Sequence, residues 1–221
     1  MMLNLFSIFD PSTSINLSLN WISMFLIFLI FPLQFWLIPS RSQFFLKLML
    51  NFLLKEMKIL INYSLSNLII FLSLFLMILS SNFLGLFPYI FTSSSHLSFC
   101  LSLSMTFWIS MIMFSLVNFM NDFLSHLTPQ GTPYILMPFM VLIESISLII
   151  RPLTLSIRLT ANMIAGHLLF SLLGMQAQIM KNYLISMIMI PELLLFILEL
   201  SVSIIQAYVF MILMTLYSSE I

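Results

Sequence analysis

The chain has 221 residues, of which 62% are hydrophobic and only 6% are charged, and its formal net charge is zero. Soluble globular domains carry about a quarter of their residues as charged side chains, so this composition excludes that class and indicates a polytopic membrane protein. The balanced charge offers no basic surface for nucleic acid, and the single cysteine, Cys100, excludes a disulfide framework or a cysteine metal cluster.

The first predicted element is an apolar membrane span over residues 15–38, with a kink at Pro32. Residues 40–62 then predict an amphipathic basic helix that lies in the membrane surface. Its polar residues recur every three or four positions and therefore form one stripe: Ser40, Gln43, Lys47, Asn51, Lys55, Lys58 and Asn62. The alternative is a helix that packs on protein instead of lipid.

Two further spans are predicted over residues 67–87 and 97–119, with a turn over 85–97 and a polar loop over 121–133. Two longer apolar stretches follow at residues 134–173 and 184–217, with the segment 176–182 between them. The first of these is either a helical hairpin or one long, strongly tilted helix with a break near Pro152. The expected fold is therefore an all-α membrane protein of about five membrane-embedded helices and one surface helix, in a single domain.

The basic residues predict the orientation of the chain. Arg41, Lys47, Lys55 and Lys58 follow the first span, and positive residues collect on the cytoplasmic or matrix side. The amino terminus is then outside and, after an odd number of crossings, the carboxyl terminus is inside. Lys181 in an outer loop is a mild exception.

Arg158 is the least expected residue, because it lies far from either end of an apolar stretch. An arginine at the centre of a membrane helix costs about 2.5–3.5 kcal/mol on insertion scales. Glu144, Arg151 and Arg158 are spaced by seven residues, and Asn162 continues the same helical face together with small residues such as Ala165. Small residues let another helix approach closely. Arg151 can instead be an interfacial charge, since it adjoins Pro152.

A second set of polar residues lies on the other side of this helix and on the last one. His167 points away from Arg158, and Glu192, Glu199 and Gln206 are spaced by seven on the last stretch, with Ser203 among them. Facing His and carboxylate groups can relay protons. The alternatives are hydrogen bonds that hold the helices together and, for Glu192, a favourable charge in a first helical turn after Pro191.

These residues resemble the a subunit of the F-type ATP synthase, most closely the animal mitochondrial form. The resemblance rests on IESISLIIRPLTLSIRLTANMIAGH followed by LELSVSIIQAYVF, on NFLGLFPYIFTSSSHL, and on TPQGTP leading into LMPFM. The opening MMLNLFSIFDPS and the closing TLYSSE are also similar, so the resemblance covers essentially the whole chain.

The resemblance implies a non-catalytic, proton-translocating stator subunit of the mitochondrial inner membrane. It would pack against a rotating ring of c subunits and against other membrane and peripheral-stalk subunits, with no cofactor. Arg158 matches the essential arginine that faces the ring carboxylates. His167 and Glu199 match the outer half-channel, with Asn162 and Gln206 as companions. Glu144 matches the acid of the inner half-channel, and the role of Arg151 is less clear.

Two other classes remain as alternatives to the stator. A secondary ion transporter or channel would also place charges at mid-membrane, but the chain has no internal repeat or matched pair of broken helices. A redox-chain subunit would need axial histidines on facing helices. The three histidines are too few for that, since His96 falls in a turn and His126 in a loop.

Overall fold

The computed structural model describes most of the chain, and every regular element in the described residues is a helix. The described residues are 5–14, 17–26, 31–32, 34–61, 65–128, 131, 133–179 and 182–220. Within them, four helices are long and apolar enough to cross a membrane. They are α3 (Leu65–Gly85), α4 (Leu97–Asn118), α6 (Met137–Ile179) and α7 (Asn182–Glu220). The expected all-α polytopic membrane fold is confirmed.

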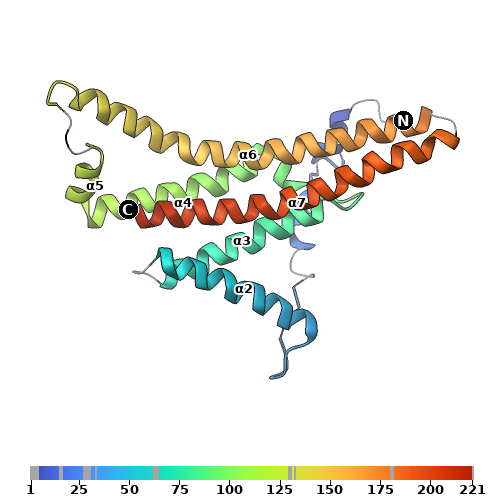
Figure 1. The fold of residues 1–221 in the computed structure, drawn as a ribbon, viewed down its shortest axis with the longest axis horizontal. Coiled ribbons are helices and arrows are strands. Elements are labelled where there is room, and N and C mark those ends of the chain that lie inside the picture. Colours follow the sequence, from blue (N-terminus) through green and yellow to red (C-terminus); the bar gives the residue numbers. More distant parts are fainter. Residues whose placement is uncertain are drawn as a thin grey trace.

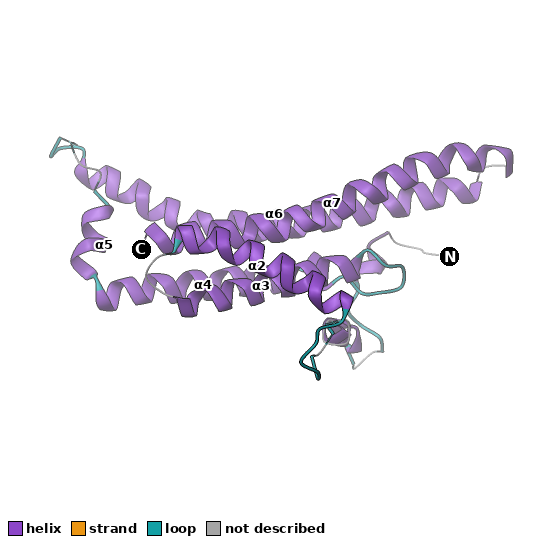
Figure 2. Cartoon of the chain, turned by 60° about the horizontal axis from the view of Figure 1, so that its bottom comes forward, coloured by secondary structure: helices purple, strands orange, loops and turns teal. Residues whose placement is uncertain are grey.

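Helices α6 and α7 run side by side over most of their length, and the first turns of α6 extend beyond the end of α7 (Figures 1 and 2). They contain 43 and 39 residues, which at 1.5 Å per residue gives lengths of about 64 and 58 Å. The hydrocarbon core is only about 30 Å thick. Helices of this length therefore cross the membrane at a strong tilt or extend well beyond it.

The structure decides between the two interpretations of the stretch around Pro152. Helix α6 continues through Pro152 without a break, and the proline ring is fully buried. A proline removes one hydrogen bond of the helical ladder, but membrane helices tolerate this where neighbouring helices cover the freed groups. Figure 1 shows that α6 bows gently along its length.

The segment predicted as the first span differs most from the expectation. In residues 15–38 the structure describes a short 3-10 helix, η2 (Leu19–Phe25), and no helix over residues 34–38. Pro32 and Pro39 lie at this point, and a proline disfavours helical geometry in the residue before it. The helical part of the predicted span therefore does not include residues 34–38. Residues 15, 16, 27–30 and 33 lie outside the described residues, so a membrane crossing here stays a prediction.

Helix α2 (Arg41–Leu60) occupies the position of the predicted amphipathic helix. The Ser40 backbone N–H donates a hydrogen bond to Gln43 Oε1 at 2.9 Å, which caps the first turn. Leu53 and Met57 are buried against the rest of the protein. The basic stripe is exposed, and so is a neighbouring apolar face that includes Phe52. One face of α2 thus packs on protein, while two others remain open.

Two connections differ from the loops that the sequence suggested. The start of the polar segment 121–133 forms a short helix, α5 (Met120–His126), with Asp122 in its first turn, where a negative charge is favourable. The serine run of the 85–97 turn forms η3 (Ser93–Ser95) and is buried rather than exposed. The polarity of these serines alone did not show that they pack against α6.

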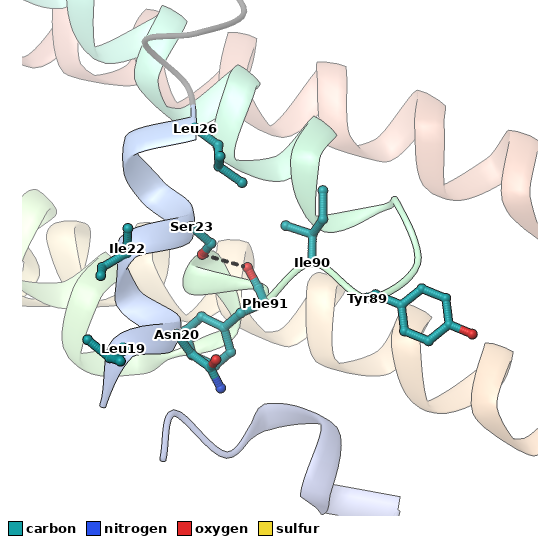
Figure 3. Close-up of a pocket in the computed structure, with 8 residues that line it drawn as sticks. All are labelled: Leu19, Asn20, Ile22, Ser23, Leu26, Tyr89, Ile90 and Phe91. Carbon is teal, nitrogen blue, oxygen red and sulfur yellow. Dashed lines mark hydrogen bonds between the residues drawn. The ribbon is translucent and has the colours of Figure 1, made fainter. Parts of the chain in front are cut away.

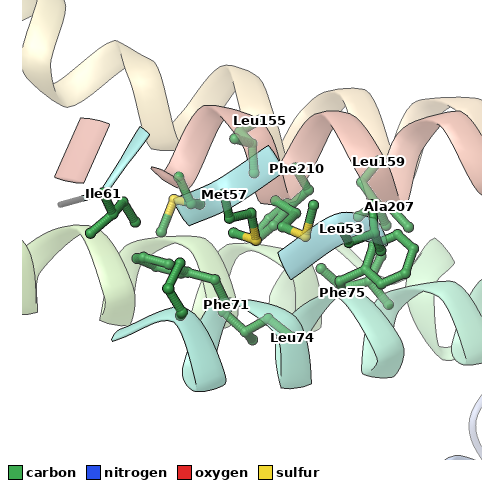
Figure 4. Packing of buried hydrophobic residues seen from close by; sticks show 14 of the residues in the cluster. Leu53, Met57, Ile61, Phe71, Leu74, Phe75, Leu155, Leu159, Ala207 and Phe210 are labelled. Carbon is green, nitrogen blue, oxygen red and sulfur yellow. The ribbon is translucent and has the colours of Figure 1, made fainter. Parts of the chain in front are cut away.

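One apolar core joins α2, α3, α4, α6 and α7, and Figure 4 shows most of its side chains. Its members include Leu53 and Met57 of α2, Phe71, Leu74 and Phe75 of α3, Cys100 of α4, Leu155 and Leu159 of α6, and Ala207 and Phe210 of α7. This core holds the surface helix and the long α6–α7 pair in a fixed relation. It therefore sets where the polar residues of α6 and α7 lie.

A cavity of about 250 Å³ lies where η2 meets the turn after α3 (Figure 3). Ser23 Oγ donates a hydrogen bond to the Phe91 carbonyl at 3.2 Å across this contact. The lining residues are mostly apolar and include none of the ionisable candidates. The cavity is therefore a packing gap between two connecting segments rather than part of the charged site.

Enlarging the smallest residue of the core should loosen the helix assembly. Ala207 has no exposed surface, so Ala207→Leu should destabilise the fold by about 1–3 kcal/mol through overpacking. The measurement is the midpoint of heat-induced unfolding of the detergent-solubilised protein. Ser110→Leu, at an exposed position of α4, serves as the control. Equal midpoints in the two variants would contradict the packing described above.

Candidate functional site

Arg158 lies near the middle of α6 and is exposed. Its neighbours on the same face, Ala161, Asn162 and Ala165, are exposed as well. Among the described residues no carboxylate lies within ion-pair distance of Arg158. An arginine stays protonated in proteins, and a bare cation in hydrocarbon is costly. The face around Arg158 is therefore suited to a partner that brings an acidic group against small side chains.

Glu199 of α7 lies on the opposite, inner side of the helix pair. It is 9% exposed, and neither carboxylate oxygen has a hydrogen-bond partner among the described residues. The carboxylate packs directly on Gly166 of α6. A Cβ built there would overlap Glu199 Oε1 and come within 2.6 Å of its carboxyl carbon. A larger residue at position 166 would require the Glu199 side chain to move from this position.

His167 flanks the same contact between α6 and α7. Its Nε2 atom is buried and has no hydrogen-bond partner in the described part of the chain. The Phe9 ring of η1 (Leu5–Phe9) stands edge-on to the imidazole, with 6.3 Å between ring centroids. The expected apposition of the His167 side of α6 to Glu199 is present through Gly166, but no hydrogen bond joins the two groups.

The other polar residues on the Glu199 face of α7 are buried or partly buried. Ser203 is 1% exposed, and its hydroxyl donates to the Leu200 carbonyl at 2.7 Å. Gln206 and Glu192 are partly buried. The fully buried Ala207 adjoins Gln206. The polar stripe therefore faces the inside of the protein, with Glu199 as its most buried acid.

Glu144 and Arg151 form a pair towards the other end of α6. Arg151 Nη2 lies 3.8 Å from Glu144 Oε1, and the Arg151 guanidinium carbon lies 5.0 Å from the centre of the Tyr217 ring of α7. Tyr217 in turn stands edge-on to Trp108 of α4, with 5.0 Å between centroids. Arg151 is therefore an ordered part of the helix contact and not a loose interfacial charge.

Sequence reasoning missed several polar groups that the structure places inside the bundle. Both amide atoms of Asn82 on α3 are buried without partners among the described residues. Tyr208 of α7 donates a hydrogen bond to Glu56 Oε2 of α2 at 3.1 Å. A lone Asn within an apolar span was a usable signal. Tyr208 and Tyr217 gave none, because tyrosines in apolar helices usually only fill space.

These features define a polytopic helical membrane protein with ionisable groups held inside its membrane helices. The family model for the ATP synthase A chain matches residues 17–219. The protein named ATP synthase subunit a in Anopheles quadrimaculatus is 54% identical over 225 residues, and those of Drosophila yakuba and Aedes aegypti are 53% identical over 223 and 225 residues. Each match covers all of both chains. The chain therefore belongs to the ATP synthase A chain family, which confirms the resemblance drawn from its motifs.

A methyl group at position 166 should disturb the site, whereas one at position 174 should not. In Gly166→Ala the new Cβ would meet the Glu199 carboxylate, so α6 and α7 must separate or the acid must move. In Gly174→Ala nothing lies within 4 Å, and the change should stabilise the helix by about 0.5–1 kcal/mol. Thermal unfolding midpoints of the two variants give the comparison. A Gly166→Ala protein as stable as Gly174→Ala would contradict the contact.

Proposed function

We propose that the chain is the proton-translocating stator subunit of an ATP synthase in the mitochondrial inner membrane. In this function it provides two half-channels against a rotating ring of c subunits and is not an enzyme on its own. The supporting observation is the order of ionisable groups along α6. Arg158 lies between Glu144 on one side and the Gly166–His167 segment that meets Glu199 on the other.

The spacing along α6 suits two half-channels that reach the ring from opposite membrane surfaces. Glu144 precedes Arg158 by fourteen residues and His167 follows it by nine, or about 21 and 14 Å along the helix axis. Together they span about 35 Å along the axis of α6, so the two groups lie at different depths in the membrane even where α6 is tilted. A proton taken up at one group therefore cannot pass to the other along this helix without crossing the region of Arg158.

In the proposed mechanism the outer half-channel uses His167 and Glu199, with Asn162, Ser203 and Gln206 as polar companions. A proton reaches Glu199 or His167 from the outer side and passes to a ring carboxylate. Arg158 holds each arriving carboxylate in its ionised form and repels a proton that would cross directly. The ring turns, and the proton leaves through Glu144 on the inner side. Arg151 accompanies Glu144, while Glu192 lies nearer the outer end of the path.

The energy of one crossing explains why a rotor and a gate are needed. One charge moved through the membrane gains about 2.3 kcal/mol per 100 mV, which is too little for ATP synthesis at ordinary potentials. A ring that adds several crossings overcomes this limit only if no proton passes without turning it. A permanent cation such as Arg158 meets this requirement because it cannot itself carry a proton.

The proposed orientation places the amino terminus on the intermembrane side and the carboxyl terminus on the matrix side. Supporting this, the exposed basic stripe of α2 carries Lys47, Lys55 and Lys58, and such residues favour the matrix side. Helix η1 lies near the His167 end of α6, and α7 ends at the opposite end of the molecule (Figure 1). The outer half-channel would then open near η1, and the remaining exposed apolar faces would meet lipid and other subunits.

Removing the guanidinium of Arg158 should stop coupled synthesis while the complex still assembles. The side chain is exposed and has no ion pair among the described residues, so Arg158→Ala should cost little folding energy. The assay imposes a proton gradient on membranes that contain the assembled complex and records ATP synthesis and proton leak. Ile157→Ala, at the neighbouring exposed position, is the control. Synthesis at a normal rate in Arg158→Ala would overturn the stator mechanism, and leave a secondary transporter as the alternative.

Replacing the buried acid by its amide should slow proton uptake without preventing assembly with the ring. Glu199→Gln keeps the shape of the side chain but cannot accept and release a proton. The rate of ATP synthesis should therefore fall by about tenfold or more. The same membrane assay measures it, with Ser201→Ala on the exposed side of α7 as the control. Normal turnover of Glu199→Gln would remove this residue from the proton path.

A further inference from the structure

The inner end of the helix pair contains an ordered series of four side chains from three helices. Trp108 of α4 is 3% exposed and stands edge-on to Tyr217 of α7, at an angle of 82° between ring planes. The Arg151 guanidinium of α6 lies over the Tyr217 ring, and Arg151 in turn faces Glu144. Each member is thus in contact with the next, from the buried indole to the more exposed carboxylate.

The contact between Arg151 and Glu144 is looser than a normal buried ion pair. Their nearest nitrogen and oxygen atoms are 3.8 Å apart, whereas hydrogen bonds between charged groups are about 2.7–2.9 Å long. The Glu144 side chain keeps 41% of its surface exposed. The guanidinium therefore acts on this carboxylate through its charge, while the carboxylate oxygens remain open to another proton donor.

The Tyr217 ring contributes to this geometry. An arginine seven residues after a glutamate lies on the same helical face, and its long side chain can reach down to form a two-bond bridge. In the structure the face of the Tyr217 ring engages the guanidinium instead, as aromatic rings do with cations. The ring itself is fixed edge-on against Trp108, so it cannot easily swing aside.

We propose that Tyr217 is a positioning residue, whose ring keeps the Arg151 guanidinium out of hydrogen-bonding contact with Glu144 and so leaves that carboxylate free to exchange protons. This inference rests on the proposed function, in which Glu144 releases protons to the inner side. A two-bond bridge would occupy both carboxylate oxygens of Glu144 and block proton exchange there. In the looser pair, the Glu144 carboxylate can still accept a proton that comes from the ring and release it to water.

The test compares three variants in assembled membrane complexes, with ATP synthesis under an imposed proton gradient as the readout. Tyr217→Phe keeps the ring and should run at the wild-type rate. Tyr217→Leu removes the ring, lets Arg151 close onto Glu144, and should slow synthesis about tenfold. In an Arg151→Gln background the same Tyr217→Leu change should have no further effect, because the cation that the ring restrains is gone.

A purely structural role for Tyr217 predicts other results. Loss of packing would slow Tyr217→Leu equally in the wild-type and Arg151→Gln backgrounds, since independent effects add, and that outcome would overturn the inference. A wild-type rate in Tyr217→Leu would overturn it as well. Assembly is checked on native gels, and Tyr217→Met replaces the leucine variant if the latter does not assemble.

Glu144→Gln separates a failure of this inference from a failure of the proposed function. Slow synthesis in Glu144→Gln together with a normal rate in Tyr217→Leu would refute only the positioning role. A normal rate in Glu144→Gln would remove Glu144 from the exit path, and both the exit half of the proposed function and the role of Tyr217 would fall with it.

Discussion

The cost of a charge in hydrocarbon is the constraint on which the rest of this structure depends. A soluble protein leaves such groups in water, but α6 and α7 carry Arg158 and Glu199 within apolar helices. Each unpartnered buried polar group costs about 1–3 kcal/mol. The apolar core that joins α2, α3, α4, α6 and α7 offsets this cost, and the fold can therefore hold a few polar groups in unfavourable positions. Polar groups left unpaired in this way are typical of functional sites.

The lengths of α6 and α7 follow from the same constraint. Two helices of ordinary membrane-spanning length would contact each other over a short distance. Helices of about 60 Å give α6 and α7 a long shared surface. Along it, the Gly166–Glu199 contact and the Arg151–Tyr217 contact lie well apart. Each of these two contacts joins α6 to α7 and covers one ionisable side chain. The helix pair is thus fixed at two places, with Arg158 on the open face between them.

Sequence patterns predicted the helices well, because apolar length and polar breaks are local signals. The third predicted span, 97–119, agrees closely with α4, Leu97–Asn118. Residues 34–38 of the first predicted span are not helical, because the nearby Pro32 and Pro39 disfavour a helix there despite the apolar side chains. Pro152 had the opposite outcome, since neighbouring helices cover it and α6 continues. Hydropathy cannot distinguish these cases, because the difference lies in what packs against each proline.

The candidate site was predictable to the extent that it lies on single helix faces. Seven-residue spacing correctly grouped Glu144 with Arg151 and placed Glu199 on an inward stripe. Spacing reports only on one helix, however, and cannot say which residue of a neighbour comes opposite. Tyr217 and Gly166 were missed for this reason. Their importance arises from where α7 crosses α6, which depends on the packing of all the core helices.

The division between exposed and buried groups is consistent with a single requirement of the proposed function. A fixed cation has to touch the moving partner, and Arg158 lies on the exposed face. Groups that exchange protons with water have to avoid that partner except at the point of transfer, and Glu199 and His167 are turned into the α6–α7 contact. If the positions were exchanged, a buried arginine would need a permanent carboxylate as its partner. Exposed proton-exchanging groups would in turn contact the ring directly rather than only at the point of transfer. Protons could then pass from one half-channel to the other without rotation.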